Sequence, residues 1–335
     1  MAKKLIPLLL LLLLLCGCAQ EKQVYQTVFL DVFDTVTTLR GYETSEEAFQ
    51  QRAEQVHQEL TKYHRLFDIY NDWPGGLKQV NDNAGLSPVQ VEQPVLELLA
   101  DCRRDCEATG GKVNVAMGSV LYLWHQAREA GLNDPANAAL PDMEALREAA
   151  RHTSFDTVVV DEQAGTVYLS DPAQRLDVGA IAKGWSAQRV SQLLPEGYML
   201  NVGGNVCTRG TKPGGGKWNI AVQSPNVGED NLCVVSLAGQ SLVTSGDYQR
   251  SYTVDGKNYH HIIDPDTLWP AAYYNGVTVL CPDSGMADCL TTALFCMPLE
   301  EGQKLVESLD GVEAMWCTPD KQATTSSGWD SHLKK

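Results

Sequence analysis

The spacing of hydrophobic residues along the chain predicts six helices, and shorter segments of alternating polarity predict seven strands. The third helix has a typical start in Pro141 and Asp142. The predicted helices cover residues 46–63, 92–108, 142–151, 181–194, 286–297 and 299–309. The predicted strands cover residues 155–160, 166–170, 198–202, 217–223, 232–237, 251–254 and 275–281.

The order of these elements predicts the fold class. Runs of strands are interrupted by separate helices, which favours an α+β fold over a doubly wound parallel sheet. No linker rich in Pro, Gly or Ser and no internal repeat divides the chain. We therefore expect one two-lobed domain over residues 27–320, with mixed or antiparallel sheets and packed helices, followed by a polar tail at 321–335.

The first residues are typical of a bacterial lipoprotein. Two lysines precede an apolar run at residues 5–15, which is too short to span a bilayer comfortably and fits a secretory signal. The run ends near Cys18 in a segment that resembles a lipobox. We expect a signal peptide at 1–17, a lipidated Cys18 and a polar tether at 18–26, so that the domain lies outside the cytoplasm, anchored to the cell membrane. An uncleaved anchor helix is the alternative.

The charge of the chain limits its partners. Its formal net charge is −16, from 42 acidic and 26 basic residues. Such a surface repels nucleic acid and anionic lipid head groups, so neither is expected to bind. A negative surface can still recruit a cation and can carry one local basic pocket.

The cysteines do not indicate a metal site. Eight follow Cys18, and none forms a CxxC pair, which argues against structural zinc. Export would permit disulfides, but a chain of this length can build a core without them. Cys289 and Cys296 lie one helical repeat apart in an apolar segment. We expect mostly buried thiols and leave the pairing open.

Small residues surround one acid and one lysine at residues 176–185. Residues 176–178 suit a buried strand end, and helical spacing begins at Ile181. A helix N-terminus offers free N–H groups and a partial positive charge to an anion, and Lys183 adds a full charge. The segment therefore predicts a phosphate site, with a tight turn and a surface lysine as the alternative.

Two further clusters could form the wall of a ligand site. Gly203 and Gly204 follow a predicted strand and would let the backbone approach a flat or charged ligand closely. Residues 244–248 (Thr-Ser-Gly-Asp-Tyr) offer hydroxyls, a carboxylate and an aromatic ring after a strand-like segment. Either cluster could equally be a plain turn.

Residues 260–267 and 286–294 carry the strongest candidate chemistry. Alternation along a strand would send His260 and His261 to opposite faces, so only one could face a pocket. An imidazole there suits proton transfer from a hydroxyl, although a structural histidine is the alternative. On a helix, Asp288 and Thr292 share a face and could hold a hard cation such as Mg²⁺. Otherwise the acid merely complements the helix dipole.

Taken in order, these clusters resemble the ApbE family of FAD:protein FMN transferases. The resemblance extends over residues 27–318, nearly the whole chain after the leader. Five matches in the family's order are more specific than any one alone. The strongest matches are residues 176–184, 201–204, 244–248, 261–267 and 287–293, and the weaker ones are residues 33–35, 67–70 and 111–114 together with Gly118 and Trp124.

The resemblance implies a magnesium-dependent transferase. FAD would bind with Mg²⁺ at its pyrophosphate, a Thr or Ser hydroxyl of a target protein would attack the FMN-side phosphorus, and AMP would leave. Targets would be acceptor flavoproteins such as subunits of membrane redox pumps or extracellular electron-transfer proteins. Two alternatives are a magnesium-dependent FAD pyrophosphatase and an FAD-binding lipoprotein without chemistry. The presence of both Asp288 and Thr292 argues against the second.

The resemblance also implies roles for individual residues. His261, Lys183 and Asp288 would be the catalytic groups. The metal ligands would be the carbonyl of Ala180 with Asp288, Thr291 and Thr292. The FAD contacts would be Phe33, Tyr70, Lys112, Val113, Asn114, Asp177, Lys183, Gly203, Gly204, Ser245, Gly246, Asp247 and Ile262. Two departures leave local details open: Leu268 stands where the family often has glycine, and Asn114 stands where many relatives have aspartate.

Overall fold

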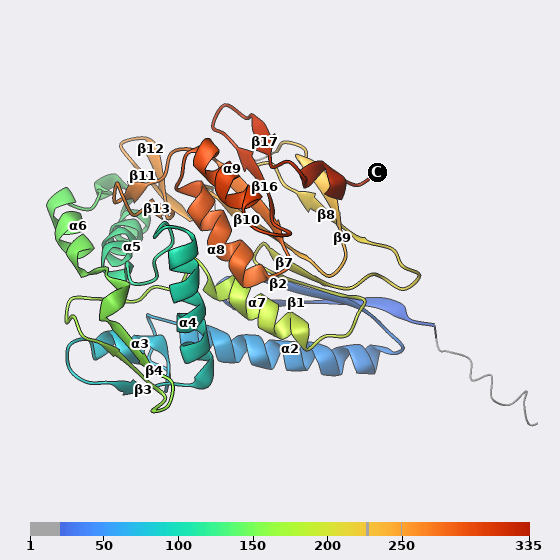
Figure 1. Ribbon diagram of the computed structural model, residues 1–335, viewed down its shortest axis with the longest axis horizontal. Coiled ribbons are helices and arrows are strands. Elements are labelled where there is room, and N and C mark those ends of the chain that lie inside the picture. Colours follow the sequence, from blue (N-terminus) through green and yellow to red (C-terminus); the bar gives the residue numbers. More distant parts are fainter. Residues whose placement is uncertain (1–20, 226–227, 249) are drawn as a thin grey trace, which may run out of the picture.

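The computed structural model describes residues 21–225, 228–248 and 250–335, and its centre is one eight-stranded sheet. The strand order is β1-β2-β6-β7-β10-β15-β16-β17, and every neighbouring pair in this sheet is antiparallel. Figure 1 shows α8, α7 and α2 side by side across one face of it. The predicted α+β fold with antiparallel sheets and packed helices is confirmed.

The strands of the large sheet are β1 (Gln23–Val32), β2 (Thr35–Glu43), β6 (Tyr198–Val202), β7 (Asn205–Arg209), β10 (Ser241–Gly246), β15 (Gly276–Cys281), β16 (Glu313–Cys317) and β17 (Ala323–Thr325). The shorter strands pair in smaller sheets. They are β3 (Val89–Gln90), β4 (Val158–Asp161), β5 (Thr166–Leu169), β8 (Trp218–Val222), β9 (Cys233–Leu237), β11 (Ser251–Val254), β12 (Lys257–His260), β13 (Ile263–Asp264) and β14 (Trp269–Pro270).

The helices begin and end close to the predicted positions where a prediction exists. The α-helices are α2 (Glu46–Phe67), α3 (Leu77–Asp82), α4 (Gln93–Ala108), α5 (Gly118–Asn133), α6 (Met143–Ala149), α7 (Ala182–Gln192), α8 (Ser284–Phe295) and α9 (Leu299–Glu307). Short 3₁₀ helices are η2 (Pro135–Asn137), η3 (Ala150–His152), η4 (Phe155–Thr157) and η5 (Trp329–His332).

Helix α2 illustrates how the sequence builds the main core. Ser45 caps its N-terminus by accepting a hydrogen bond from the Ala48 N–H, 3.2 Å away. Phe49, Ala53, Val56 and Leu60 recur every three or four residues and are buried against the sheet. The apolar face of α2 therefore covers strands β1 and β2 at the edge of the sheet.

The N-terminal hairpin joins the rest of the sheet through a distant strand. β2 pairs with β6, so that Thr37 lies opposite Val202 and Gly41 lies opposite Tyr198. β1 already begins at Gln23, inside the tether predicted for residues 18–26, because its Tyr25 ring stacks on Phe49 of α2. The predicted signal peptide at 1–17 and the lipidation site at Cys18 lie outside the described residues.

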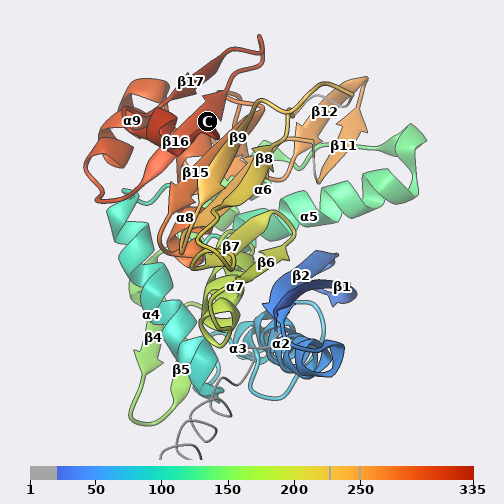
Figure 2. The same ribbon diagram turned by 90° about the vertical axis from the view of Figure 1, so that its right-hand side faces the viewer.

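The polar tail predicted for residues 321–335 is wrong, because this segment packs into the domain. β17 pairs with β16, and the Lys334 N–H donates to the Val234 carbonyl. Trp329 has 1 % of its surface exposed and belongs to a second core with the β8–β9 hairpin, on the side of the sheet away from α8 (Figure 2). The buried Trp329 ring, the β16–β17 pairing and the Lys334 bond together hold this polar segment against the sheet.

Replacing Trp329 should therefore destabilise the whole domain. Trp329→Ala removes a fully buried ring, and we expect a loss of about 3–5 kcal/mol in the free energy of unfolding. Urea denaturation followed by circular dichroism measures this loss. The neighbouring Asp330 is exposed, so Asp330→Ala serves as the control and should leave the midpoint nearly unchanged. Equal midpoints for the two variants would mean that η5 is not part of the core.

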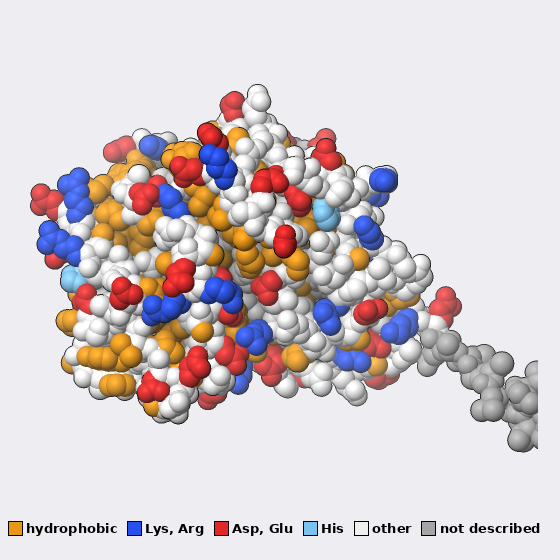
Figure 3. Space-filling view, in the orientation of Figure 1, with side chains coloured by type: hydrophobic (Ala, Val, Ile, Leu, Met, Phe, Trp, Pro, Cys, Tyr) orange, Lys and Arg blue, Asp and Glu red, His pale blue; other side chains and the backbone are white. Residues whose placement is uncertain are grey.

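The described cysteines are free thiols, and six of the eight are buried. This confirms the expectation of mostly buried thiols. No helix among the described residues is long and apolar enough to cross a membrane. On the face seen in Figure 3, acidic and basic side chains are interspersed, with hydrophobic side chains between them.

Candidate active site

A cavity of about 820 Å³ gathers most of the residues singled out from the sequence. Its wall includes the β1–β2 turn, the end of α2, helix α5, the start of α7, the β6–β7 turn and helix α8. Such a large, partly polar cavity suits a ligand the size of a dinucleotide. The predicted residues that line it are Phe33, Tyr70, Lys112, Val113, Asn114, Asp177, Ala180, Lys183, Gly203, Gly204, Ser245, Gly246, His261, Ile262, Asp288 and Thr292.

The segment before α7 differs from its prediction. Residues 176–178 form no strand, because their backbone is bonded to side chains and neighbouring loops instead. The Leu176 N–H donates to Asn81 Oδ1 at 2.7 Å, and the Asp177 N–H donates to the Val115 carbonyl at 2.8 Å. Helix α7 then begins without a side-chain cap. In its first turn the Ala182 N–H donates to the Val178 carbonyl and the Gly184 N–H donates to Asp288, so of these three N–H groups only that of Lys183 has no partner among the described residues and is available to an anion.

Gly184 brings α7 into close contact with α8. Its N–H donates to Asp288 Oδ2 at 2.8 Å, and Lys183 Nζ lies 3.8 Å from the same oxygen. Asp288 has only 4 % of its surface exposed. Burial raises the pKa of its carboxyl group, while Lys183 and the Gly184 N–H favour the charged form. The contact fixes one carboxylate beside one ammonium in the cavity wall.

Any side chain at position 184 should disturb this contact. A Cβ there would lie 2.3 Å from the Ser284 carbonyl oxygen and 2.4 Å from Asp288 Cβ, so the two helices would have to move apart. We expect Gly184→Ala to cost about 1–3 kcal/mol of unfolding free energy. Thermal unfolding measures it. At Gly216 the nearest atom to a new Cβ is 4.0 Å away, so Gly216→Ala is the control. Equal stability of the two variants would contradict the close approach.

The donor atoms near Asp288 fit a magnesium ion. Asp288 and Thr292 both line the cavity from α8, as predicted, and Ala180 lines it from the opposite segment. Among the described residues no hydrogen bond reaches the Ala180 carbonyl, since the Gly184 N–H that could approach it donates to Asp288. The described chain contains no group of three His, Cys, Asp or Glu side chains suited to a metal. One carboxylate with neutral oxygens is typical of Mg²⁺, which also takes waters and substrate phosphates.

His260 and His261 differ in their hydrogen-bond partners. β12 ends at His260, so strand alternation does not extend to His261. His260 uses both ring nitrogens: Nδ1 accepts from the Ile262 N–H, and Nε2 donates to the Ala271 carbonyl at 2.8 Å. His261 is exposed to the cavity, and its ring has no hydrogen bond among the described residues. It is therefore the histidine that is free to accept a proton.

The surroundings of His261 keep its imidazole neutral. Partial withdrawal from water inside the cavity is the main cause that lowers the pKa of His261, and the cations Arg250 and Lys183 lower it further. A neutral imidazole is the form that accepts a proton. The electrostatics of the cavity thus favour a base at this position.

Aromatic side chains form another part of the cavity wall. The Tyr70 ring lies 4.5 Å from the ring of His125, centroid to centroid, and both line the cavity. Phe33 lines it from the β1–β2 turn, where Phe33 and Asp34 adopt φ angles of 55° and 51°. Left-handed backbone at non-glycine residues is strained and is often retained at functional sites. These rings provide flat surfaces on which an aromatic ligand can stack.

Lys112 connects the cavity wall to the turn that carries Asp264. Its Nζ lies 3.2 Å from Asp264 and 2.6 Å from Asp266. In the same turn the Leu268 N–H donates to the Asp264 carbonyl, and Leu268 adopts a φ of 59°. This is a conformation that glycine adopts without strain. The turn therefore keeps a glycine-type shape although leucine occupies the position.

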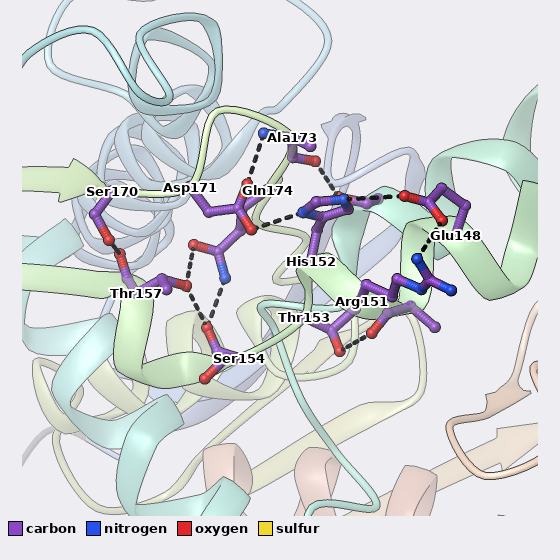
Figure 4. Close-up of polar contacts among 12 residues, drawn as sticks. Glu148, Arg151, His152, Thr153, Ser154, Thr157, Ser170, Asp171, Ala173 and Gln174 are labelled. Atoms are coloured by element: carbon purple, nitrogen blue, oxygen red, sulfur yellow. Dashed lines mark hydrogen bonds and ion pairs between the residues drawn. The ribbon is translucent and has the colours of Figure 1, made fainter.

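Asn114 bonds Thr153, which lies in the polar network shown in Figure 4. Its Nδ2 donates to the Thr153 carbonyl at 2.8 Å. The network continues through His152, whose Nδ1 lies 2.7 Å from Asp171, and through Gln174, which bonds the Ser154 carbonyl. Side chains in this network bond one another or the backbone, and the network reaches Asn114 through the Thr153 carbonyl.

The structure does not bring two of the predicted residues to the cavity. Thr291 is fully buried, and its hydroxyl donates to the Asp288 carbonyl and contacts Ser245 Oγ. Asp247 does not line the cavity either, and its N–H donates to the Asn275 carbonyl. Conversely, His125, Arg128 and Arg250 line the cavity but were not singled out. No local pattern marks them, since α5 was not predicted and Arg250 lies in a loop.

Comparisons with known proteins agree with this geometry. A family model described as "ApbE family" matches residues 33–316. A FAD:protein FMN transferase of Treponema pallidum is 33 % identical, and the alignment covers 93 % of this chain and 90 % of that protein. A protein of the same name from Klebsiella pneumoniae is 32 % identical, with coverage of 82 % and 84 %.

Solved structures show the same fold. The ApbE protein of Thermotoga maritima has a TM-score of 0.81 and 27 % identity, and the match covers 93 % of this chain and 100 % of that one. The flavin transferase ApbE of Vibrio cholerae has a TM-score of 0.76 at 22 % identity, with coverage of 93 % and 100 %, which supports the fold alone. From the matched segment and from this similarity in sequence and structure, the chain belongs to the ApbE family.

Proposed function

We propose that this chain is an FAD:protein FMN transferase that requires Mg²⁺ and releases AMP. Relatives that match most of its length are named FAD:protein FMN transferase. The observation that carries the proposal is the meeting, in one cavity, of Asp288, Thr292 and Lys183 with the free imidazole of His261. Phosphoryl transfer needs positioning and charge neutralisation more than an enzyme nucleophile, and this cavity offers both.

The proposed reaction exchanges the phosphoanhydride linkage of FAD for a phosphoester linkage to the acceptor. A Thr or Ser hydroxyl of the acceptor protein attacks the FMN-side phosphorus of FAD, while His261 takes the hydroxyl proton. The bond from that phosphorus to the bridging oxygen breaks, and AMP leaves with this oxygen. The Lys183 ammonium, the Lys183 backbone N–H and the positive end of the α7 dipole offset negative charge on the phosphates. FMN remains joined to the acceptor.

Asp288, Thr292 and the Ala180 carbonyl would hold the metal. Bound Mg²⁺ supplies charge neutralisation at the pyrophosphate. The close contact between Gly184 and α8 keeps Asp288 beside the N-terminus of α7, where a phosphate would bind. Tyr70 and Phe33 would receive the flat rings of FAD, and Lys112, paired with Asp264, would keep that wall rigid.

The proposed location is the outer side of the cell membrane. The lipobox-like segment ending at Cys18 supports lipid anchoring, and acceptors exposed on that side would be accessible to the domain. Flavin-bearing subunits of redox pumps and extracellular electron-transfer proteins are therefore the proposed acceptors. Mass spectrometry of the protein from membranes would detect acylation at Cys18.

Intact-mass spectrometry tests the activity directly. The chain in detergent is incubated with FAD, Mg²⁺ and a candidate acceptor that carries a Thr or Ser in a flavinylation motif, and AMP and free FMN are assayed in parallel. We expect the acceptor to gain the mass of FMN less one water with one AMP released, and EDTA to prevent both. AMP and free FMN without a mass gain would indicate a pyrophosphatase, and bound FAD without turnover would indicate a binding protein.

A further inference from the structure

A second concavity lies beside the cavity and has no part in the chemistry above. It has a volume of about 480 Å³ and lies along the outer side of α2, near the start of α4. We propose that this surface, called here the α2 groove, docks an acidic segment of the acceptor protein. The inference rests on the proposed function. The residues that define the groove are His57, Lys62, Arg65, Trp73, Pro74 and Glu92.

The groove is basic although the chain is strongly acidic. Lys62 and Arg65 face it with one acid, Glu92, and the ring of His57 also lines it but is bonded to Asp31 at 2.9 Å, whereas the whole chain has 42 acidic and 26 basic residues. Lys62 Nζ lies 3.9 Å from Glu92, and both side chains are about half exposed, so this pair is weak and can be exchanged. A local positive site on a negative protein favours an acidic partner at this point of the surface.

The guanidinium group of Arg65 has an orientation and available donors that suit a carboxylate. Its guanidinium carbon lies 4.8 Å from the centre of the Trp73 ring, which fixes the plane of the group. Among the described residues no carboxylate pairs with it, so its N–H donors remain available. A planar guanidinium with a fixed orientation binds a carboxylate through two parallel hydrogen bonds. Trp73 and Pro74 add an apolar surface for the neighbouring part of a peptide.

The groove and the cavity lie next to each other on α2. His64 and Phe67 of the helix line the cavity, whereas Lys62 and Arg65 line the groove. The following segment repeats this division, with Tyr70 in the cavity wall and Trp73 in the groove. An extended peptide advances about 3.3 Å per residue. Docking therefore requires a segment whose hydroxyl enters the cavity to continue past this part of α2 and place its acidic side chains in the groove.

A peptide fits this groove better than an anionic lipid surface does. The site is concave and contains an aromatic ring beside its cations, which suits a few side chains of a protein segment. A bilayer is flat and would also meet the acidic remainder of the chain, which it repels. We therefore expect the acceptor to carry negative charge close to its flavinylated residue.

Fluorescence anisotropy with a labelled peptide tests the docking. The probe has ten residues, with one threonine flanked on one side by four acidic residues, and it is titrated with the full chain in detergent. We expect the double variant Lys62→Glu, Arg65→Glu to bind about tenfold more weakly than the parent, and to bind a probe with lysines in place of the acids more tightly.

The matched control carries the same change in net charge elsewhere. Lys217 and Lys304 are exposed residues outside both concavities, so Lys217→Glu, Lys304→Glu should leave the affinity within about threefold. Equal weakening in both double variants would overturn the proposal, because only long-range charge would then act. Loss of binding to phosphatidylglycerol vesicles, with peptide binding unchanged in the groove variant, would also overturn it in favour of a lipid site.

The groove variant also separates this proposal from the proposed function. Its affinity for FAD should equal that of the parent, because none of the changed residues lines the cavity. With an acidic acceptor, FMN transfer should show a raised KM for the acceptor and an unchanged kcat. If the parent binds the acidic probe but transfers no FMN, docking stands and the proposed reaction fails. A parent that transfers FMN without binding the probe would contradict the docking site alone.

Discussion

Asp288→Ala should lower the rate of FMN transfer by at least about a thousandfold, because it removes the only carboxylate among the donors gathered at the proposed magnesium site. Thr292 and the Ala180 carbonyl remain, but two neutral oxygens bind Mg²⁺ weakly. Lys183 also loses its nearest acid, which lies 3.8 Å away. Titration of transfer against Mg²⁺ by intact-mass spectrometry measures the loss, and calorimetry with Mn²⁺ measures metal binding independently.

A second aspartate of the same helix provides the control for this variant. Asp283 caps α8 by accepting from the Met286 N–H at 2.9 Å and does not line the cavity. Asp283→Ala should cost about 1 kcal/mol of stability through loss of the cap and leave transfer nearly unchanged. Equal activities of the two variants at every Mg²⁺ concentration would show that Asp288 holds no metal.

His261→Ala should reduce FMN transfer by about a hundredfold to ten-thousandfold while FAD binding persists, since a general base contributes within this range. The change removes the one histidine ring of the 260–261 pair that has no hydrogen bond in the described structure and faces the cavity. Equilibrium dialysis with FAD measures binding, and intact mass measures transfer. A variant that transfers at the parent rate would exclude His261 as the base.

The pH profile of the parent gives a second test of this role. The pKa of His261 is lowered, so the imidazole stays neutral as the pH falls through the ordinary histidine value of about 6.5. Transfer should therefore decline only in more acidic solution, once the pH passes the lowered pKa and the base is protonated. His260→Ala is the control: it removes a ring bonded to Ala271 and should affect stability more than the profile. A decline centred at the ordinary value would contradict the lowered pKa.

The sequence predicted the helix that carries Asp288 and Thr292 better than it predicted the strands around the cavity. Asp288 and Thr292 were placed correctly because a helix imposes a fixed four-residue spacing, and α8 is strongly apolar around them. The β1–β2 hairpin was not predicted, since β1 pairs on one side only and its outer face is exposed, which weakens the apolar alternation. Burial of that hairpin depends on α2 and β6, which no local pattern reveals.

Other differences have tertiary causes as well. Residues 176–178 have the composition of a strand, but their hydrogen-bonding groups meet Asn81 and the Val115 carbonyl, so no ladder forms. Thr291 has the same residue type as Thr292 but lies one position round the helix, where its hydroxyl is used inside the fold. Lys112 could be recognised from its motif, whereas its pairing with Asp264, 152 residues away in sequence, could not.

The pairing of β2 with β6 sets the order in which this protein can fold. The two strands are joined by more than 150 residues, so the register that places Thr37 opposite Val202 closes a very long loop. Closing such loops is slow, because the chain loses much of its freedom before distant contacts stabilise it. The β1–β2 hairpin is synthesised first, but it pairs with its neighbour β6 only after residue 202 has been synthesised. The cavity wall also includes Asp288 and Thr292, so an amino-terminal fragment that ends before α8 cannot complete the ligand site.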